Sequence, residues 1–141
     1  MRSLLVLIAI TGLLGSAVPT IHGQDLTGDM RALQGKWRVS FADERSIVLE
    51  FKDGTLTHTN HAPTGSGEPA RGSFTIDETQ SPKHMTWKDV DFAGRKMEVN
   101  CCIYELHGDT LLMMGGIKDR PKTFISGQGK PHTTWIFKRV K

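Results

Sequence analysis

The segment Cys102-Ile-Tyr-Glu-Leu-His-Gly-Asp-Thr-Leu-Leu-Met-Met114 decides the fold, because it contains two apolar runs separated by a polar break. Its flanks are rich in β-branched, aromatic and long apolar side chains, which favour strands. The break contains Gly108, which tolerates a positive φ, and Asp109, whose side chain can bond nearby backbone amides. We therefore predict a hairpin here. A hairpin this apolar needs further strands to cover it.

Alternating runs elsewhere in the chain supply those strands. Residues 36–41 and 46–52 alternate apolar and polar side chains, so each should bury one face. Asp53-Gly54 is a strong two-residue hairpin signal after the second run. By the same pattern, further strands are expected at residues 55–60, 71–77, 85–87, 96–106, 110–114 and 133–139.

The segment before the first strand has a different period. Leu26, Met30 and Leu33 recur at spacings of four and three residues, which predicts a short amphipathic helix ended by Gly35. Two stretches rich in Pro, Gly and Ser, residues 61–69 and 126–131, read as flexible loops.

About eight short strands joined mostly by tight turns, without repeated βα units, favour an all-β fold. We expect an eight-stranded antiparallel up-and-down barrel with one short N-terminal helix, since closure removes exposed strand edges. Such a barrel is just wide enough to be filled by side chains or to hold one small ligand. The barrel domain should span residues 24–141.

Residues 1–23 have the pattern of a cleaved secretory signal peptide. Arg2 precedes an apolar run, and small residues follow around Ala17, which favours cleavage there; cleavage near Gly23 is the alternative. The apolar run is shorter than the ~20 residues that span a bilayer, so an uncleaved anchor is disfavoured. We expect a periplasmic or secreted protein without stable membrane insertion after cleavage.

Composition indicates one globular domain and argues against nucleic-acid binding. The chain has 141 residues, 38% of them hydrophobic, and a formal net charge of +3. Removing residues 1–23 removes one basic residue, Arg2, so 17 basic residues face 15 acidic ones and the net charge is +2. The basic residues are scattered among acidic ones, which argues against nucleic acid. The C-terminal third is the most basic part, and we interpret it as a solvated face; binding of an anionic surface or polymer is the alternative.

The two cysteines are adjacent, which argues against a disulfide between them. Neighbours on a strand point to opposite faces, so bridging Cys101 and Cys102 would strain a regular ladder. We expect one thiol in the core and the other on the opposite face; a reactive or intermolecular thiol is the alternative.

The chain resembles lipocalins through Gly35-Lys36-Trp37, which follows a short helix and opens the first strand, and through Arg139 near the end. A wider pattern over roughly residues 26–140 is similar to the uncharacterised lipocalin-like domain family abundant in planctomycete bacteria. That pattern comprises Leu33 to Trp37, Gly72-x-Phe74-x-Ile76-Asp77, Pro82-Lys83, Ile103 to Leu111, Arg120-Pro121-x-x-Phe124 and Lys138-Arg139. Departures at Cys102, Met113 and Met114 are apolar swaps compatible with packing.

The resemblance implies an exported barrel with no assigned reaction, and its matched residues are mainly structural: Gly35, Trp37, Gly108, Asp109, Arg120, Pro121 and Arg139. Trp37 should be buried, with the Arg139 guanidinium stacked on it and bonded to carbonyls of the preceding helix. For Arg120 we expect a buried ion pair with Asp109 or Glu105; an anion site is the alternative.

Motifs for catalysis are lacking. The sequence contains no Gly-rich phosphate loop, nucleophile elbow or His-Glu-x-x-His, and spacing alone does not pair its carboxylates for acid/base work. His58 and His61 are a weak metal-ligand candidate beside a loop. We expect no enzyme, no cofactor and no metal.

Two functions stay open. The first is binding of a small apolar or amphipathic ligand in the barrel; the second is a filled barrel that contacts a protein or polymer through its loops. An interior volume of ~300 Å³ or more, open to one end, would favour the binder. Tyr104 should face inward with its hydroxyl bonded to a neighbour or to the ligand. The candidate ligand-lining residues are Phe41, Leu49, Phe51, Phe74, Trp87 and Tyr104.

Overall fold

The computed structural model describes residues 26–125 and 133–141, and within them the chain forms one helix and ten strands. The expected signal peptide (1–23) and the expected loop at 126–131 lie outside the described residues. The elements are α1 (Gly28–Leu33), β1 (Gly35–Ser40), β2 (Ser46–Lys52), β3 (Thr55–Ala62), β4 (Gly65–Ser66), β5 (Ala70–Asp77), β6 (Lys83–Phe92), β7 (Arg95–Lys96), β8 (Asn100–His107), β9 (Thr110–Ile117) and β10 (Thr134–Arg139).

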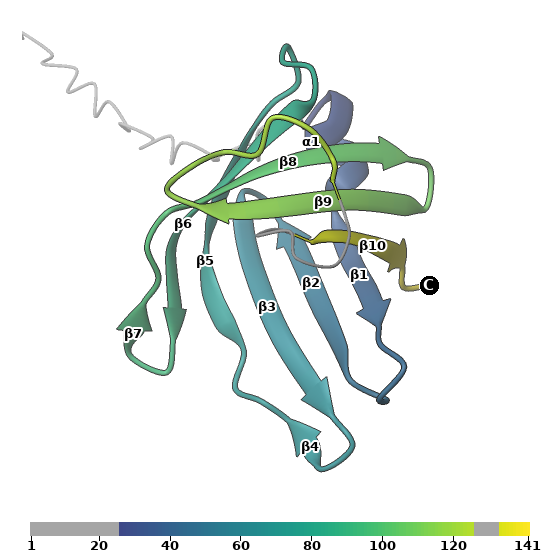
Figure 1. The fold of residues 1–141 in the computed structure, drawn as a ribbon, viewed down its shortest axis with the longest axis vertical. Coiled ribbons are helices and arrows are strands. Elements are labelled where there is room, and N and C mark those ends of the chain that lie inside the picture. The colour runs from purple at the N-terminus through teal and green to yellow at the C-terminus, as the bar shows by residue number, and fades with distance from the viewer. Residues whose placement is uncertain (1–25, 126–132) are drawn as a thin grey trace, which may run out of the picture.

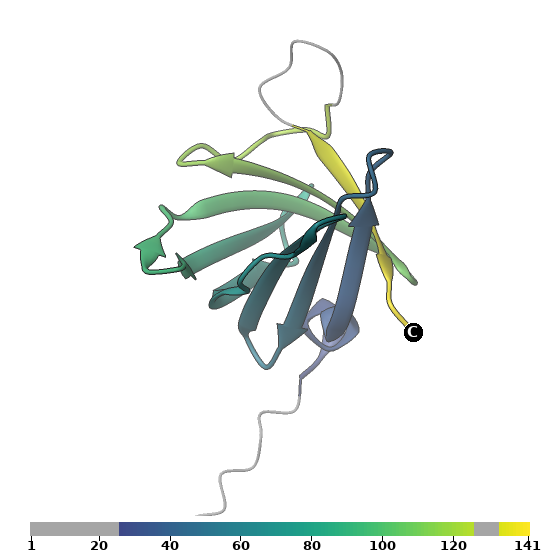
Figure 2. The same ribbon diagram turned by 90° about the horizontal axis from the view of Figure 1, so that it is seen from below.

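The eight longer strands close into an antiparallel barrel (Figures 1 and 2). Each pairs with the next one along the chain, in the order β1, β2, β3, β5, β6, β8, β9 and β10, and β10 pairs back with β1. The two-residue strands β4 and β7 extend β3 and β6 outside this ring. The sequence-based prediction of an all-β, eight-stranded up-and-down barrel with one short helix is confirmed.

The hairpin turns follow from their residues. Asp53 and Gly54 have φ of 48° and 81°, the two successive positive values that a two-residue type I′ turn requires. Gly108, with φ of 57°, opens the two-residue turn between β8 and β9, so the hairpin predicted at residues 102–114 is confirmed.

Two local predictions were wrong. The strand expected from residue 96 begins at Asn100, because Ala93-Gly94 turns the chain so that β7 first folds back on β6. The stretch at 61–69 is not simply a loop. His61 and Ala62 still belong to β3 and pair with Ser66 and Gly65 of β4, so two residues suffice for the connection.

The packed core lies at the end of the barrel that α1 covers. Trp37 is fully buried, and its indole Nε1 donates a hydrogen bond to the Leu33 carbonyl at 2.7 Å. The other large side chains that are essentially inaccessible to solvent are Tyr104, Phe51, Phe137, Leu33, Leu49, Leu56, Met85, Ile103 and Leu111.

Arg139 joins the last strand to the helix over this core. Its guanidinium carbon lies 4.1 Å from the Trp37 ring centroid, and its terminal nitrogens donate to the Gln34 and Ala32 carbonyls at 2.8 and 2.6 Å. The stacked guanidinium predicted from the sequence is confirmed. Arg139 Nε also donates to Asp109 at 2.9 Å, so the turn between β8 and β9 is held to the same end.

A second polar contact anchors the start of α1 inside the barrel rim. The Tyr104 hydroxyl donates to an Asp29 carboxylate oxygen at 3.0 Å, and Lys83 Nζ donates to the same oxygen at 2.6 Å. The Tyr104 hydroxyl is therefore bonded to a neighbour, one of the two alternatives expected. Burial raises the pKa of Tyr104 well above its usual range, and it stays protonated.

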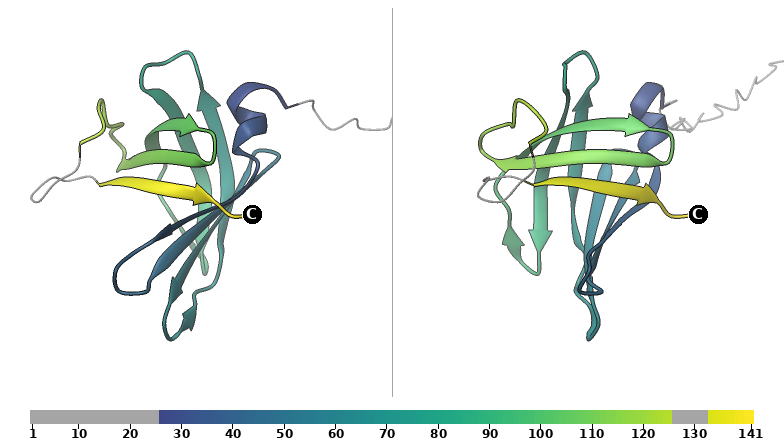
Figure 3. Two further views of the ribbon diagram at one scale, coloured as in Figure 1. Left: turned by 90° about the vertical axis from the view of Figure 1, so that its right-hand side faces the viewer. Right: turned by 45° about the vertical axis from the view of Figure 1, so that its right-hand side comes forward.

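The seam between the first and last strands closes over a short length. β1 pairs with β2 throughout, from Gly35↔Phe51 to Ser40↔Ser46. Against β10, the register in the described chain comprises Trp37↔Arg139 and Arg38↔Lys138. Figure 3 shows β10 and β1 meeting near the C-terminal end of β10 and diverging from there. The barrel is thus tightly closed near α1 and splayed at the other end.

Candidate functional site

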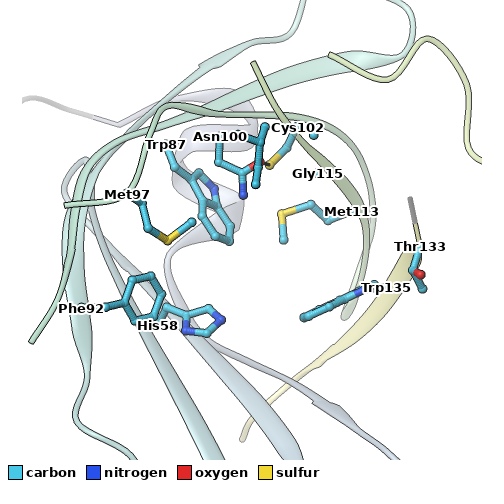
Figure 4. A pocket seen from close by; sticks show the side chains of 12 residues that line it. His58, Trp87, Phe92, Met97, Asn100, Cys102, Met113, Gly115, Thr133 and Trp135 are labelled. Atoms are coloured by element: carbon cyan, nitrogen blue, oxygen red, sulfur yellow. Dashed lines mark hydrogen bonds between the residues drawn. The ribbon is translucent and has the colours of Figure 1, made fainter. Parts of the chain in front are cut away.

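A cavity of about 490 Å³ occupies the splayed end of the barrel (Figure 4). On β10, Arg139 marks the α1 end and Trp135, four residues earlier, lines the cavity. We call it the inner cavity. Its lining residues are His58, Trp87, Phe92, Met97, Asn100, Cys102, Met113, Gly115, Gly116, Ile117, Thr133 and Trp135.

Strand register explains why these side chains converge. Trp87 of β6 is opposite Asn100 of β8, and Met113 of β9 is opposite Trp135 of β10, so two cross-strand pairs form adjacent parts of the wall. His58 comes from β3, and Figure 4 shows its ring edge pointing into the cavity opposite Trp135. The rings of His58 and Phe92 meet edge to face, with centroids 5.4 Å apart.

Among the described residues, the lining of the inner cavity carries no formal charge, because none of these twelve residues is Asp, Glu, Lys or Arg. Its polar side chains are His58, Asn100 and Thr133, which are set among aromatic rings and thioethers. Burial lowers the pKa of His58 below its ordinary value of 6.5, so the imidazole is neutral at neutral pH. An uncharged aromatic wall with a few hydrogen-bonding groups suits an apolar or amphipathic molecule.

The thiol in this wall is unreactive. Cys102 is fully buried, and burial raises its pKa to about 12, so the nucleophilic thiolate is scarce at neutral pH. Its Sγ donates to Asn100 Oδ1 at 3.6 Å. Cys101 is half-buried, and both thiols are free, in agreement with the prediction of one core thiol and one on the other face.

A second cavity of about 770 Å³ lies beside the inner one, where the β1–β2 and β3–β4 hairpins extend past β10. We call it the outer cavity. It shares Trp135 with the inner cavity, and its other lining residues are Phe41, Arg45, Ser46, Ile47, Asn60, His61, Ala62, Thr64, Gly65, Ser66 and Gly67. Phe41 and Trp135 meet edge to face there, with centroids 5.9 Å apart and planes at 84°.

The six candidate ligand-lining residues divide between cavity and core. Trp87 lines the inner cavity and Phe41 the outer one. Leu49, Phe51, Phe74 and Tyr104 are packed in the core cluster near α1 and belong to neither of these two linings. Leu49, Phe51, Phe74, Trp87 and Tyr104 belong to the core cluster, whereas Phe41 is an exposed side chain.

Sequence reasoning missed most of the inner wall. Trp135 lies two residues before the buried Phe137 on the same strand, and His58 lies two residues after the buried Leu56. The period of two would therefore have placed both side chains inside. Met97 was missed for another reason, since it follows β7 outside any strand and reaches the cavity from a connection.

The prediction of an ion pair between Arg120 and Asp109 or Glu105 was wrong. Arg120 donates instead to the backbone carbonyls of Met85 and Cys102, which are opposite each other on β6 and β8, and to Thr86 Oγ1 at 2.7 Å. The segment after β9 folds back and brings the guanidinium to these strands.

Gly116 permits that return of the chain. A side chain there would meet the Asp119 carbonyl oxygen, and the Pro121 ring lies 3.2 Å from the Cβ position. Pro121 and Gly116 are thus packed against each other where the chain leaves β9.

The two histidines considered as metal ligands have separate surroundings. His58 lines the inner cavity, whereas His61 lies in the outer one with its Nδ1 2.6 Å from Ser66 Oγ. In the described part of the chain, no group of three or more His, Cys, Asp or Glu is placed to hold a metal ion. No helix among the described residues is long and apolar enough to cross a membrane.

Fold and site together define a closed antiparallel β-barrel whose interior is packed at one end and hollow at the other. Comparison with protein-family models finds no match, and comparisons with curated proteins and with solved structures find no significant match.

Proposed function

We propose that this protein is an exported, non-enzymatic barrel that binds a small apolar or amphipathic molecule in its inner cavity. The observation that carries the proposal is the cavity of about 490 Å³, which exceeds the ~300 Å³ lower limit of ordinary ligand pockets. This volume favours the binder over a filled barrel that acts only through its loops.

The wall chemistry supports an uncharged occupant for the inner cavity. A charged group would lose its hydration there without meeting a charged partner among the described lining residues, which is costly. Aromatic and thioether side chains adapt well to flat or flexible apolar groups. His58 and Asn100 offer hydrogen bonds to one or two polar atoms of the ligand.

Two parts of the proposal rest on the sequence alone: that the protein is exported, and that it resembles the lipocalin-like family. The apolar segment at 1–23 supports secretion, and the Gly35-x-Trp37 and Arg139 pattern supports the resemblance to the lipocalin-like family. The stacked Trp37 and Arg139 side chains are consistent with that resemblance.

The test is isothermal titration calorimetry of the purified protein with dodecanol and with naphthalene methanol. We expect saturable binding with a negative heat-capacity change, the mark of apolar burial. Met113→Trp, which places a large ring in the inner cavity, should abolish it.

Leu112→Trp is the matched control, because Leu112 is adjacent on β9 and points to the opposite face. Circular dichroism establishes that both variants are folded. Absence of binding by the unaltered protein, or equal binding by the folded Met113→Trp variant, would contradict the proposal.

A further inference from the structure

The inner and outer cavities adjoin along two walls. Both are lined by Trp135 on the β10 side. On the β3 side, His58 lines the inner cavity and Asn60 the outer one, two residues apart on the same strand face and so separated by roughly 7 Å along the strand. If a molecule fills the inner cavity and is longer than it, the part that extends beyond the inner cavity therefore lies in the outer one.

The two cavities differ in charge. Among the described residues, the outer lining contains one formally charged side chain, Arg45, together with hydroxyl, amide and imidazole groups such as Ser66, Asn60 and His61. The described part of the combined surface is thus apolar at depth, and the guanidinium of Arg45, paired with the exposed Asp43, lies at the mouth. That arrangement suits an amphipathic anion that enters with its apolar end first and competes with Asp43 for the guanidinium.

Local contacts hold Arg45 in the outer cavity, but its guanidinium stays accessible to solvent and to a ligand. Its guanidinium lies 5.9 Å from the Phe41 ring centroid, and its backbone carbonyl accepts from the Phe41 amide at 2.8 Å. Nε donates to Asp43 at 2.6 Å, but the two side chains are 64% and 52% exposed. An ion pair this exposed contributes little, so a ligand anion can compete for the guanidinium.

We propose that the ligand is an amphipathic carboxylate, with its apolar body in the inner cavity and its carboxylate beside Arg45 in the outer cavity. The planar guanidinium fork suits a carboxylate, and Arg45 bonds Asp43 through Nε rather than through its two Nη groups. This inference rests on the proposed function, since it requires an apolar body in the inner cavity.

The experiment compares three probes that share one apolar chain: dodecanoate, dodecanol and dodecylammonium. Calorimetric titrations of the purified protein are made below the probes' aggregation concentrations. We expect dodecanoate to bind about three- to tenfold more tightly than dodecanol, and dodecylammonium to bind most weakly. The preference for dodecanoate should shrink as salt rises, because the site is solvent-exposed.

Arg45→Gln should remove the preference for dodecanoate and leave dodecanol binding unchanged. Arg71→Gln, an exposed arginine on β5, is the matched control and should retain the preference. Equal affinities for dodecanoate and dodecanol in the unaltered protein, or a preference that survives in Arg45→Gln, would overturn the inference alone. Failure of all three probes to bind would overturn both the inference and the proposed function.

Discussion

Trp37 and Arg139 show how two side chains close one end of the barrel. The indole is fully buried, its N–H is bonded to the Leu33 carbonyl, and the guanidinium covers its face. Each polar group taken from water thus has a partner, which is the condition for burying such residues at little cost. The pair also joins the first strand, the last strand and α1.

Trp37→Ala should lower the free energy of unfolding by roughly 3–5 kcal/mol, because it leaves a cavity and removes the surface on which Arg139 stacks. Urea denaturation followed by circular dichroism measures the change. Trp135→Ala is the comparison, since Trp135 is half-buried at the hollow end and its loss should cost less stability. A midpoint that barely moves in Trp37→Ala would show that the indole does not support the core.

Individual contacts were predictable where a motif specified them. The resemblance to lipocalins that Gly35, Trp37 and Arg139 carry implied the stacked pair. The prediction for Arg120 was wrong because it paired the guanidinium with a carboxylate, whereas the guanidinium bonds backbone carbonyls. Every residue has a carbonyl, so the sequence carries no signal for that choice.

At the scale of elements, α1 is fixed to the barrel by a small polar cluster. Asp29 accepts from Lys83 and Tyr104 through one carboxylate oxygen, and its backbone amide donates to Glu78 at 2.7 Å. A helix of six residues has little stability of its own, so these contacts and the burial of Leu33 hold it in place.

Asp29 should therefore make the stability of the helix cap depend on pH. Although burial alone would raise its pKa, hydrogen bonds from Lys83 and Tyr104 hold the pKa of Asp29 below the ordinary 3.8. A lowered folded-state pKa means that the contribution is present above 3.8 and is lost as pH falls through the folded value. Denaturation of the unaltered protein and of Asp29→Asn should accordingly differ at neutral pH and converge in acid. A difference that does not depend on pH would contradict this role.

The order and number of the eight barrel strands were predictable because a period of two and Asp-Gly or Gly-Asp turns are local signals. The depth at which each inward side chain lies along the barrel axis was not predictable. Phe41 and Leu49 both alternate inward, yet Leu49 is fully buried and Phe41 is 38% exposed. The difference arises where β1 separates from β10, and that separation depends on the pairing of strands from the two ends of the chain.

At the scale of the whole molecule, the packed end and the hollow end have different electrostatics. Two ion pairs, Asp29–Lys83 and Asp109–Arg139, lie at the α1 end. Among the described residues that line the inner cavity, two have titratable side chains, His58 and Cys102, and both are neutral near pH 7. In acid, His58 becomes protonated, so the affinity of the inner cavity for an uncharged ligand should change with pH there.

Binding of dodecanol should weaken as pH falls through the pKa of His58, which burial holds below 6.5. Protonation places a positive charge in an apolar wall, so affinity should fall by at most about tenfold per pH unit. Above 6.5 the imidazole is neutral and affinity should be constant. Calorimetric titrations across this range test the prediction.

His58→Phe should make the affinity independent of pH, whereas His61→Gln in the outer cavity should retain the dependence. The same acid-induced weakening in His58→Phe would show that another group, or partial unfolding, is responsible.

The division of the barrel into a packed end and a hollow end also bears on how the protein can change over evolutionary time. Substitutions at Met97, Met113 or Trp135 alter the shape of the chamber without touching the indole and guanidinium that fasten the opposite end. Descendants of one ancestral chain could thus diverge in what they carry while keeping the same framework.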